Sequence, residues 1–398
     1  MTSITAVPSV SGTHIRVEIP EIARTIWFEW QGPTQIVGAA PLNDNFALLA
    51  ALPIAMRRGC DLHVRGTVDP TLLAGAERYA KIWSQWRPDK YRPVELFADQ
   101  EISDIVRQDT QPWAYPFSGG VDSTFSIFAN SAGDTGRDTH VPGSVFLVQG
   151  FDYPLSDTTF FPRLEQRVTR VARLLKLPIL VCSTNWKEFC IQYELDTQLG
   201  LAAIGHMLSA THAGISIAAD FTYREDLHTL PWGNSQYVPH LLGSSQFQVA
   251  TGGADTLRVD KMRYLSKIPN ALEMISICRA PDGEGNRLNC EKCEKCVRTA
   301  LGLYVATGSV KPTFERVPSA FRIFSMPHIA LVELVFWSDI LRRMPARDRA
   351  VRWAIRLLLA RSRMTLRFNA LLQPAEKRYL RPLHSYLRRQ LGRMRSVQ

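Results

Sequence analysis

The stretch that decides the fold of this chain is Ser118-Gly119-Gly120-Val121-Asp122-Ser123. It follows a short apolar run at 114–117 and opens a segment of helical character that begins at Thr124. Two adjacent glycines let the backbone approach an anion closely and adopt positive φ. The N–H groups of such a turn, with the positive end of the helix that follows, bind phosphate groups. The hexapeptide in this setting therefore predicts a nucleotide phosphate site.

Side chains of the same loop extend this prediction. Ser118, Ser123 and Thr124 would add hydroxyl donors for phosphate oxygens. Asp122 is an acid inside a phosphate loop, which suits a divalent cation such as Mg²⁺ bridging it to the phosphates. A plain strand–turn–helix junction, capped by Ser or Asp, is the alternative interpretation of the same residues.

The sequence beyond the loop alternates between strand and helix patterns. Apolar strand patterns lie at 144–150, 177–182 and 214–219, and helix patterns at 163–176 and 199–212. Such alternation predicts βαβ units, and hence an α/β fold with a parallel sheet and helices on both faces. The Gly- and Ser-rich stretch 232–254 is predicted to be a long loop or insertion.

In this setting SGGVDS at 118–123 resembles the PP-loop of the N-type ATP pyrophosphatase superfamily. The resemblance implies an adenine nucleotide alpha hydrolase-like fold that binds ATP and Mg²⁺. It also implies the reaction: a substrate oxygen attacks ATP, pyrophosphate leaves, and ammonia, an amine or sulfur then displaces AMP. The Gly-Lys-Ser/Thr ending of a Walker A loop is absent, which disfavours γ-phosphoryl transfer.

Further nucleotide contacts are expected at the carboxyl ends of neighbouring strands, where parallel α/β sheets bind their ligands. The candidates for the adenine pocket are Val148, Gln149, Gly150 and Ser183. Arg258 and Lys261 are three residues apart and share a helix face, so they could clamp a phosphate or neutralise leaving pyrophosphate. Strand-end turns and a solvated helix terminus are the plain alternatives. The candidate catalytic residues are Asp122, Ser118, Ser123, Arg258 and Lys261.

Seven cysteines occur, an odd number that excludes a fully paired disulfide framework. Four of them cluster: Cys278, Cys290, Cys293 and Cys296. Four soft ligands at this spacing suit a tetrahedral metal, and Zn²⁺ is the metal we expect. An iron–sulfur cluster is the rival, and four free thiols are the plain alternative.

The cysteine segment resembles one particular family within this superfamily. ICRAPDGEGNRLNCEKCEKCVRTALGL, at 277–303, resembles the zinc-binding segment of 7-cyano-7-deazaguanine synthases, and Arg298 matches an Arg of that family. Together the two motifs cover about 114–308. The resemblance implies an AMP-forming ligase that adenylates a small carboxylate or carbonyl compound for attack by ammonia or another nucleophile.

Other residues allow rival functions. Cys182 ends a predicted strand and would be the nucleophile if the protein were a PP-loop thiolating enzyme acting on RNA or a nucleotide, although a lone Cys there is more often a buried apolar residue. Trp232, Gly233, Asn234 and His240 lie in a loop that could cover the substrate. His206 and His212 do not share a helix face, so we expect structural roles for both.

The basic charge of the chain is concentrated at one end. The net charge is +10, but residues 311–398 carry 19 Lys and Arg against 5 Asp and Glu, a surplus of +14, which leaves the rest at −4. We expect three regions: an α+β domain at 1–110, the PP-loop domain with the four-cysteine metal site at 111–310, and a separable basic helical region at 311–398. That last region is expected to lie outside the catalytic centre.

Three roles suit the basic region: a helical bundle packed on the core, a surface for nucleic acid or another acidic partner, and a surface for an anionic membrane. The second would also suit a nucleotide-binding scaffold. A homodimer is a further open expectation. No run approaches the roughly 20 apolar residues that a membrane helix needs, and the N-terminus does not resemble a secretory leader, so a cytoplasmic protein is expected.

Overall fold

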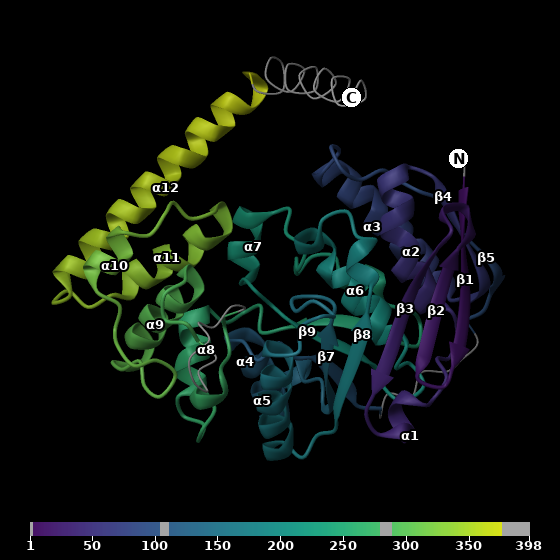
Figure 1. The fold of residues 1–398 in the computed structure, drawn as a ribbon, viewed down its shortest axis with the longest axis horizontal. Coiled ribbons are helices and arrows are strands. Elements are labelled where there is room, and N and C mark those ends of the chain that lie inside the picture. The colour runs from purple at the N-terminus through teal and green to yellow at the C-terminus, as the bar shows by residue number, and fades with distance from the viewer. Residues whose placement is uncertain (1–2, 104–110, 279–288, 376–398) are drawn as a thin grey trace, which may run out of the picture.

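A computed structural model describes residues 3–103, 111–278 and 289–375 of the chain (Figure 1). Ten strands of the described residues form one sheet in the order β10-β9-β6-β7-β8-β3-β2-β1-β4-β5. The sheet is mostly parallel, and it runs through both the N-terminal and the middle regions of the sequence.

Five parallel strands make up the half of the sheet that carries SGGVDS. They are β6 (Trp113–Pro116), β7 (Pro142–Gln149), β8 (Ile179–Thr184), β9 (Gly214–Ala218) and β10 (Gln248–Gly252). Counted from β6, their spatial order is 3-2-1-4-5, which is the doubly wound arrangement. The order reverses at β6, because the strands after it along the chain lie on both of its sides.

The stretch 232–254 is not wholly a loop, which corrects the sequence prediction. Its last part forms β10, which pairs in parallel with β9 from Gln248↔Gly214 to Gly252↔Ala218. Burial of Val249 and the hydrogen bonds of the strand ladder hold this segment in the sheet. The Gly and Ser residues around the strand conceal it, because both residue types are typical of loops.

The N-terminal region supplies the other five strands. They are β1 (Ser3–Ser11), β2 (His14–Ile19), β3 (Arg24–Gln31), β4 (Asp61–Val68) and β5 (Leu96–Glu101). The alternation of buried Ile26, Phe28 and Trp30 along β3 is the half-buried strand pattern. β3 pairs antiparallel with β8, so regions 1–110 and 111–310 share one continuous sheet.

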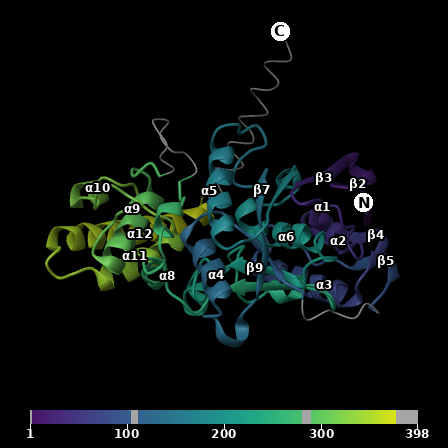
Figure 2. The ribbon, with the colours of Figure 1, turned by 90° about the horizontal axis from the view of Figure 1, so that it is seen from below.

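Helices cover both faces of the sheet, as the alternating sequence pattern predicted. One face carries α4 (Val121–Ala132), α5 (Phe160–Leu174) and α8 (Arg258–Leu265) over a shared apolar cluster. The other face carries α2 (Asn45–Arg58), α3 (Pro70–Trp86) and α6 (Tyr193–His206), again over one cluster (Figure 2). Two short helices, α1 (Thr34–Val37) and α7 (Tyr223–Thr229), lie in connections.

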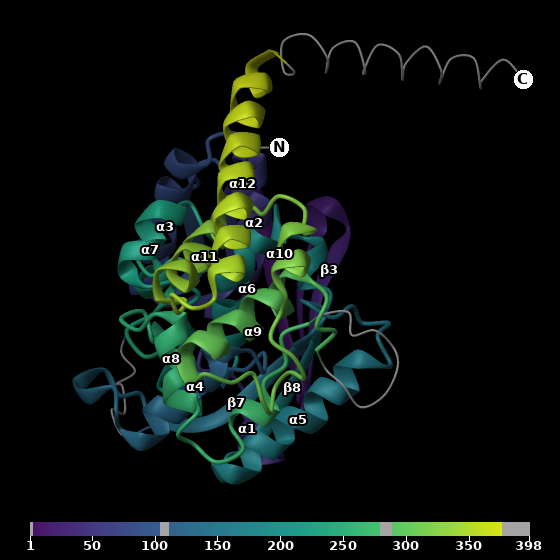
Figure 3. The same ribbon diagram turned by 90° about the vertical axis from the view of Figure 1, so that its left-hand side faces the viewer.

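The C-terminal helices form a third apolar cluster. They are α9 (Glu294–Thr307), α10 (Ala320–Phe324), α11 (Leu331–Arg343) and α12 (Arg349–Ala375). The described part of the basic region is thus mainly helical, as predicted, while 376–398 lie outside the described residues. α12 packs on α10 and α11, and its far end projects past the other helices (Figures 1 and 3). Within the described residues, no helix combines the length and apolarity needed to cross a membrane.

Candidate active site

A pocket of about 480 Å³ opens at the carboxyl ends of the parallel strands, where the strand order reverses. The loop contributes Ser118, Gly120, Val121, Asp122 and Ser123 to its lining. Phe146, Leu147 and Val148 from β7, and Ile217 and Ala218 from β9, form its floor. The switch point of a doubly wound sheet is where such folds bind ligands, so this pocket is the candidate active site.

The backbone of the loop is shaped for an anion. Gly119 has a φ of +70°, and a Cβ there would lie 3.0 Å from Leu164 Cδ1. Its carbonyl oxygen accepts from Ser276 N at 2.8 Å, which fixes the turn. Gly120 is the N-cap of α4 and gives no side-chain oxygen to the helix. The N–H groups of the first turn are therefore left for a ligand, at the positive end of a twelve-residue helix.

The loop serines face each other across the turn. The Ser118 and Ser123 hydroxyl oxygens are 3.2 Å apart, and Ser123 also donates to the Gly120 carbonyl at 3.2 Å. Both serines line the pocket. Thr124 does not line it; this residue is fully buried under the loop.

Asp122, Arg258 and Lys261, all singled out from the sequence, meet in one buried cluster. Arg258 pairs with both carboxylate oxygens of Asp122, and Lys261 Nζ lies 3.1 Å from Asp122 Oδ1. Lys261 also donates to the Ala219 carbonyl at 2.8 Å. Burial alone would raise the pKa of Asp122, but the two cations outweigh it and lower that pKa. Asp122 is therefore held ionised, and its oxygens already have cationic partners.

Another carboxylate that lines the pocket, Asp220, was missed from the sequence. Burial raises the pKa of Asp220, and the negative charge of Asp122 adds to that rise. The Trp232 indole N–H donates to Asp220 Oδ2 at 2.9 Å. The available signal was position: Asp220 follows the predicted strand 214–219, at the same edge of the sheet as the loop.

Several other predicted residues lie outside the pocket. Val148 lines it, as do Trp232 and Asn234, but the lining does not include Gly119, Gln149, Gly150, Ser183, Lys261, Gly233 or His240. Gln149 and Ser183 instead bond each other across β7 and β8, at 3.3 Å.

Cys182 is fully buried within β8, and the pocket lining does not include it. Burial raises the pKa of its thiol well above the usual value. A thiolate nucleophile needs exposure and a lowered pKa. The surroundings of Cys182 therefore argue against the nucleophile role considered for it, and this residue is a small apolar part of the core.

The C-terminal region forms one wall of the pocket, which corrects the expectation that it stands apart. Phe336 of α11 stacks on Phe221 with ring centroids 5.0 Å apart and planes at 13°. The guanidinium carbons of Arg258 and Arg298 lie 4.2 and 4.5 Å from the Phe336 ring centroid. Val332 of the same helix also lines the pocket. The basic composition of this region gives no indication of the apolar face that packs at the pocket.

Arg298 is held rigidly on α9. Its Nε and Nη2 pair with the two Glu294 carboxylate oxygens at 2.7 and 3.2 Å, and Trp337 Nε1 donates to Glu294 Oε1 at 2.8 Å. The remaining Nη1 is buried without a hydrogen-bond partner among the described residues. Arg298 lines the pocket, so its guanidinium is a candidate partner for an anionic ligand.

The four clustered cysteines converge at the start of α9. Their Sγ atoms all lie within 4.8 Å of one another, with Cys290–Cys296 and Cys293–Cys278 each at 3.8 Å. A tetrahedral Zn²⁺ with Zn–S bonds of about 2.3 Å would separate its sulfurs by about 3.8 Å. Hydrogen bonds from neighbouring thiols, chiefly Cys296, lower the pKa of Cys293. The cluster could therefore hold a metal ion such as zinc, and its last member lies two residues before Arg298.

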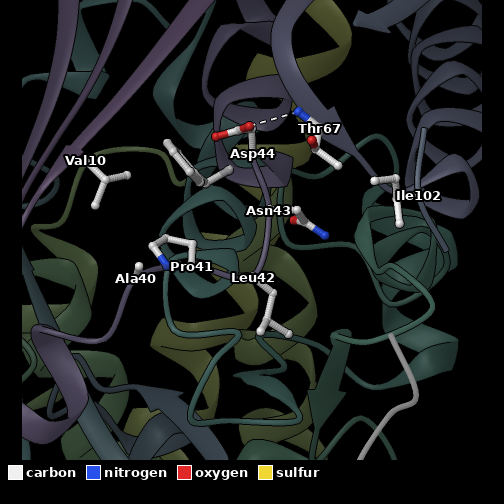
Figure 4. A pocket seen from close by; sticks show the side chains of 9 residues that line it. Val10, Ala40, Pro41, Leu42, Asn43, Asp44, Thr67 and Ile102 are labelled. Carbon is white, nitrogen blue, oxygen red and sulfur yellow. Dashed lines mark hydrogen bonds between the residues drawn. The ribbon is translucent and has the colours of Figure 1, made fainter. Parts of the chain in front are cut away.

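A second hollow, of about 360 Å³, lies in the N-terminal half and is drawn in Figure 4. Its lining combines Pro41, Leu42, Asn43 and Asp44 with Thr67 and nearby apolar side chains. The Asp44 carboxylate accepts from Thr67 N at 2.9 Å, so its main visible role is to hold the chain turn. This hollow contains none of the residues predicted to act chemically, and the switch-point pocket remains the candidate site.

Comparison of this chain with protein-family models, with curated proteins and with solved structures gives no match.

Proposed function

We propose that the protein is an AMP-forming, ATP-dependent ligase or modification enzyme that adenylates a small carboxylate or carbonyl compound for attack by ammonia. The observation that carries the proposal is the position of SGGVDS. It lies at the point where the parallel strand order reverses, at the N-terminus of α4, and it lines a pocket large enough for a nucleotide. The resemblance of the loop to the PP-loop supplies the reaction class.

In the proposed reaction, a substrate oxygen attacks the α-phosphorus of ATP. The bond from that phosphorus to the bridging oxygen breaks, and pyrophosphate leaves with the electron pair. The first-turn N–H groups of α4 and the guanidinium of Arg258 would stabilise the charge that develops on pyrophosphate. Ammonia then attacks the acyl carbon, and AMP leaves with the C–O electron pair while the nitrogen loses a proton.

The proposed reaction involves two metal ions at separate sites, Mg²⁺ in the pocket and Zn²⁺ on the four cysteines. Mg²⁺ would arrive with the ATP phosphates, and the pocket carboxylates Asp122 and Asp220, which lie close enough to interact, could bind it. Asp122 would have to give up part of its pairing with Arg258 or Lys261 to bind the ion. Zn²⁺ on the four cysteines would brace the start of α9, and so the position of Arg298.

The acceptor would lie at the α9 side of the pocket. Arg298 presents a buried N–H without a partner among the described residues, and the aromatic ring of Phe336 forms the adjacent wall. An acidic compound would pair with the guanidinium beside this wall. This favours a small carboxylate over a neutral carbonyl compound as the first substrate to test.

The test is product analysis with ATP, Mg²⁺, ammonium and a panel of small acids. Equal amounts of AMP and pyrophosphate are expected with the right acid, while ADP and phosphate would contradict the proposal. Asp122→Asn is expected to lower turnover by about 10² or more, since preorganised charge in a buried site is worth that much. Asp138→Asn, an exposed acid just beyond α4, is the matched control and should keep full activity.

A further inference from the structure

The outward face of α12 carries large apolar side chains that nothing in the described structure covers. Trp353, Leu357, Met364 and Phe368 are 59%, 47%, 67% and 60% exposed. Their spacing of four, seven and four residues puts them on one stripe of the helix. Ala360, also exposed, lies on the same stripe. An apolar stripe of this length on the outside of a helix goes beyond scattered exposed residues.

A row of arginines runs beside this stripe. Arg349, Arg356 and Arg363 are spaced seven residues apart and are exposed, so they stack along one side of the helix. The Arg356 guanidinium lies 5.8 Å from the Trp353 ring centroid. Over its whole length α12 contains six arginines and no acidic residue. The outward face is therefore half apolar and half cationic.

The core fixes which face of α12 points outward. The opposite face buries Ile355, Leu358 and Leu359 in the cluster shared with α9 and α11. Arg361, at the edge of the apolar stripe, donates to the backbone carbonyl of Phe324 at the end of α10. Phe324 itself is 55% exposed beside that edge. The helix cannot turn its stripe inward without unpacking this cluster.

We propose that α12 lies in the plane of an anionic membrane surface, with Trp353, Leu357, Met364 and Phe368 in the headgroup region and the arginines on lipid phosphates. The charge row needs an anionic partner, and a second copy of α12 would instead oppose arginine to arginine. A nucleic acid would satisfy the arginines but leave the aliphatic side chains in water. An anionic lipid surface satisfies both halves, and binding in the plane requires no spanning helix.

The experiment is co-sedimentation of the full chain with vesicles of phosphatidylcholine, alone or mixed with phosphatidylglycerol. Binding is expected only to the mixed vesicles. Arg356→Gln with Arg363→Gln should weaken it about 25-fold, since each arginine near an anionic surface contributes about a fivefold factor. Trp353→Ser with Leu357→Ser should weaken it at least about tenfold by removing the inserted apolar area.

The charge-matched control is Arg137→Gln with Arg224→Gln, which removes two exposed arginines elsewhere on the chain and should bind as wild type. All the substituted side chains are exposed, so circular dichroism is expected to show unchanged folding for every variant.

Three results would overturn the proposal. The first is no binding to mixed vesicles at low salt. The second is binding that the α12 variants leave intact, which would place the contact elsewhere on the chain. The third is loss of binding with the arginine pair but not with the apolar pair, together with tight binding of single-stranded RNA, which would assign the face to nucleic acid.

Discussion

Replacement of Phe336 by Ala tests whether the C-terminal helices belong to the catalytic body. Phe336 is 8% exposed, stacks on Phe221, and has the guanidinium groups of Arg258 and Arg298 near its ring. It therefore joins α11 to the segment after β9, to α8 and to α9. Loss of its ring should loosen all of these contacts at once.

The magnitude follows from two contributions. A Phe→Ala change in a closed core costs about 3–5 kcal/mol, but Phe336 borders a pocket, so part of the cavity term is already absent. Each lost cation–π contact at a half-buried site adds about 0.5–1 kcal/mol. We expect the free energy of unfolding to fall by about 2–4 kcal/mol.

The assay is urea unfolding followed by circular dichroism and, separately, by tryptophan fluorescence. Phe321→Ala is the matched control, because Phe321 is 79% exposed in the same region and should change the free energy by no more than about 0.5 kcal/mol. A loss below about 1 kcal/mol for Phe336→Ala would refute the integrated wall and favour a separable C-terminal region. Turnover should also fall, because Arg258 loses the ring that positions it.

Two further predictions concern the metal and the pH. Cys293→Ser should abolish zinc binding and lower the melting temperature. Cys190→Ser is the control and should keep one zinc per chain by elemental analysis, because Cys190 lies outside the group of four cysteines. Iron with visible absorbance would instead assign an iron–sulfur cluster to the site. Burial lowers the pKa of His206 to about 4, so its contribution to stability is present above its unfolded pKa of 6.5 and is lost as pH falls toward 4. The stability difference between wild type and His206→Asn should therefore shrink by up to about 1.4 kcal/mol per pH unit across that window, and a flat difference in urea unfolding would contradict this account.

The parts of the fold that could be predicted are those with a local signal. The segments 144–150, 177–182 and 214–219 are mainly apolar, and each overlaps β7, β8 or β9. The glycine pair at 119–120 marks the turn before α4 because Gly119 adopts positive φ. The convergence of the four cysteines follows from their close spacing.

The parts that could not be predicted depend on long-range packing. Nothing in the alternation of β3 indicates that it would pair with β8, which lies far along the chain. Asp220 gains its role only when the sheet brings its strand end beside Asp122. The position of Phe336 at the pocket could not be predicted for another reason. Its region is strongly basic as a whole, and net charge does not indicate which face of a helix is buried.

The C-terminal helices connect the outer face of α12 with Arg298 in the pocket. Trp337 of α11 shares one apolar cluster with Ile355 and Leu358 on the inner face of α12. Trp337 also donates to Glu294 of the neighbouring helix α9, and Glu294 holds Arg298 in the pocket. A ligand on the outer face of α12 that favours one packing of α11 must therefore bias the position of Arg298, since packed helices shift as units. If the proposed membrane contact and the proposed adenylation both hold, vesicles should change the KM for the acidic substrate more than the KM for ATP, because the α9 side of the pocket lies nearest this chain of contacts.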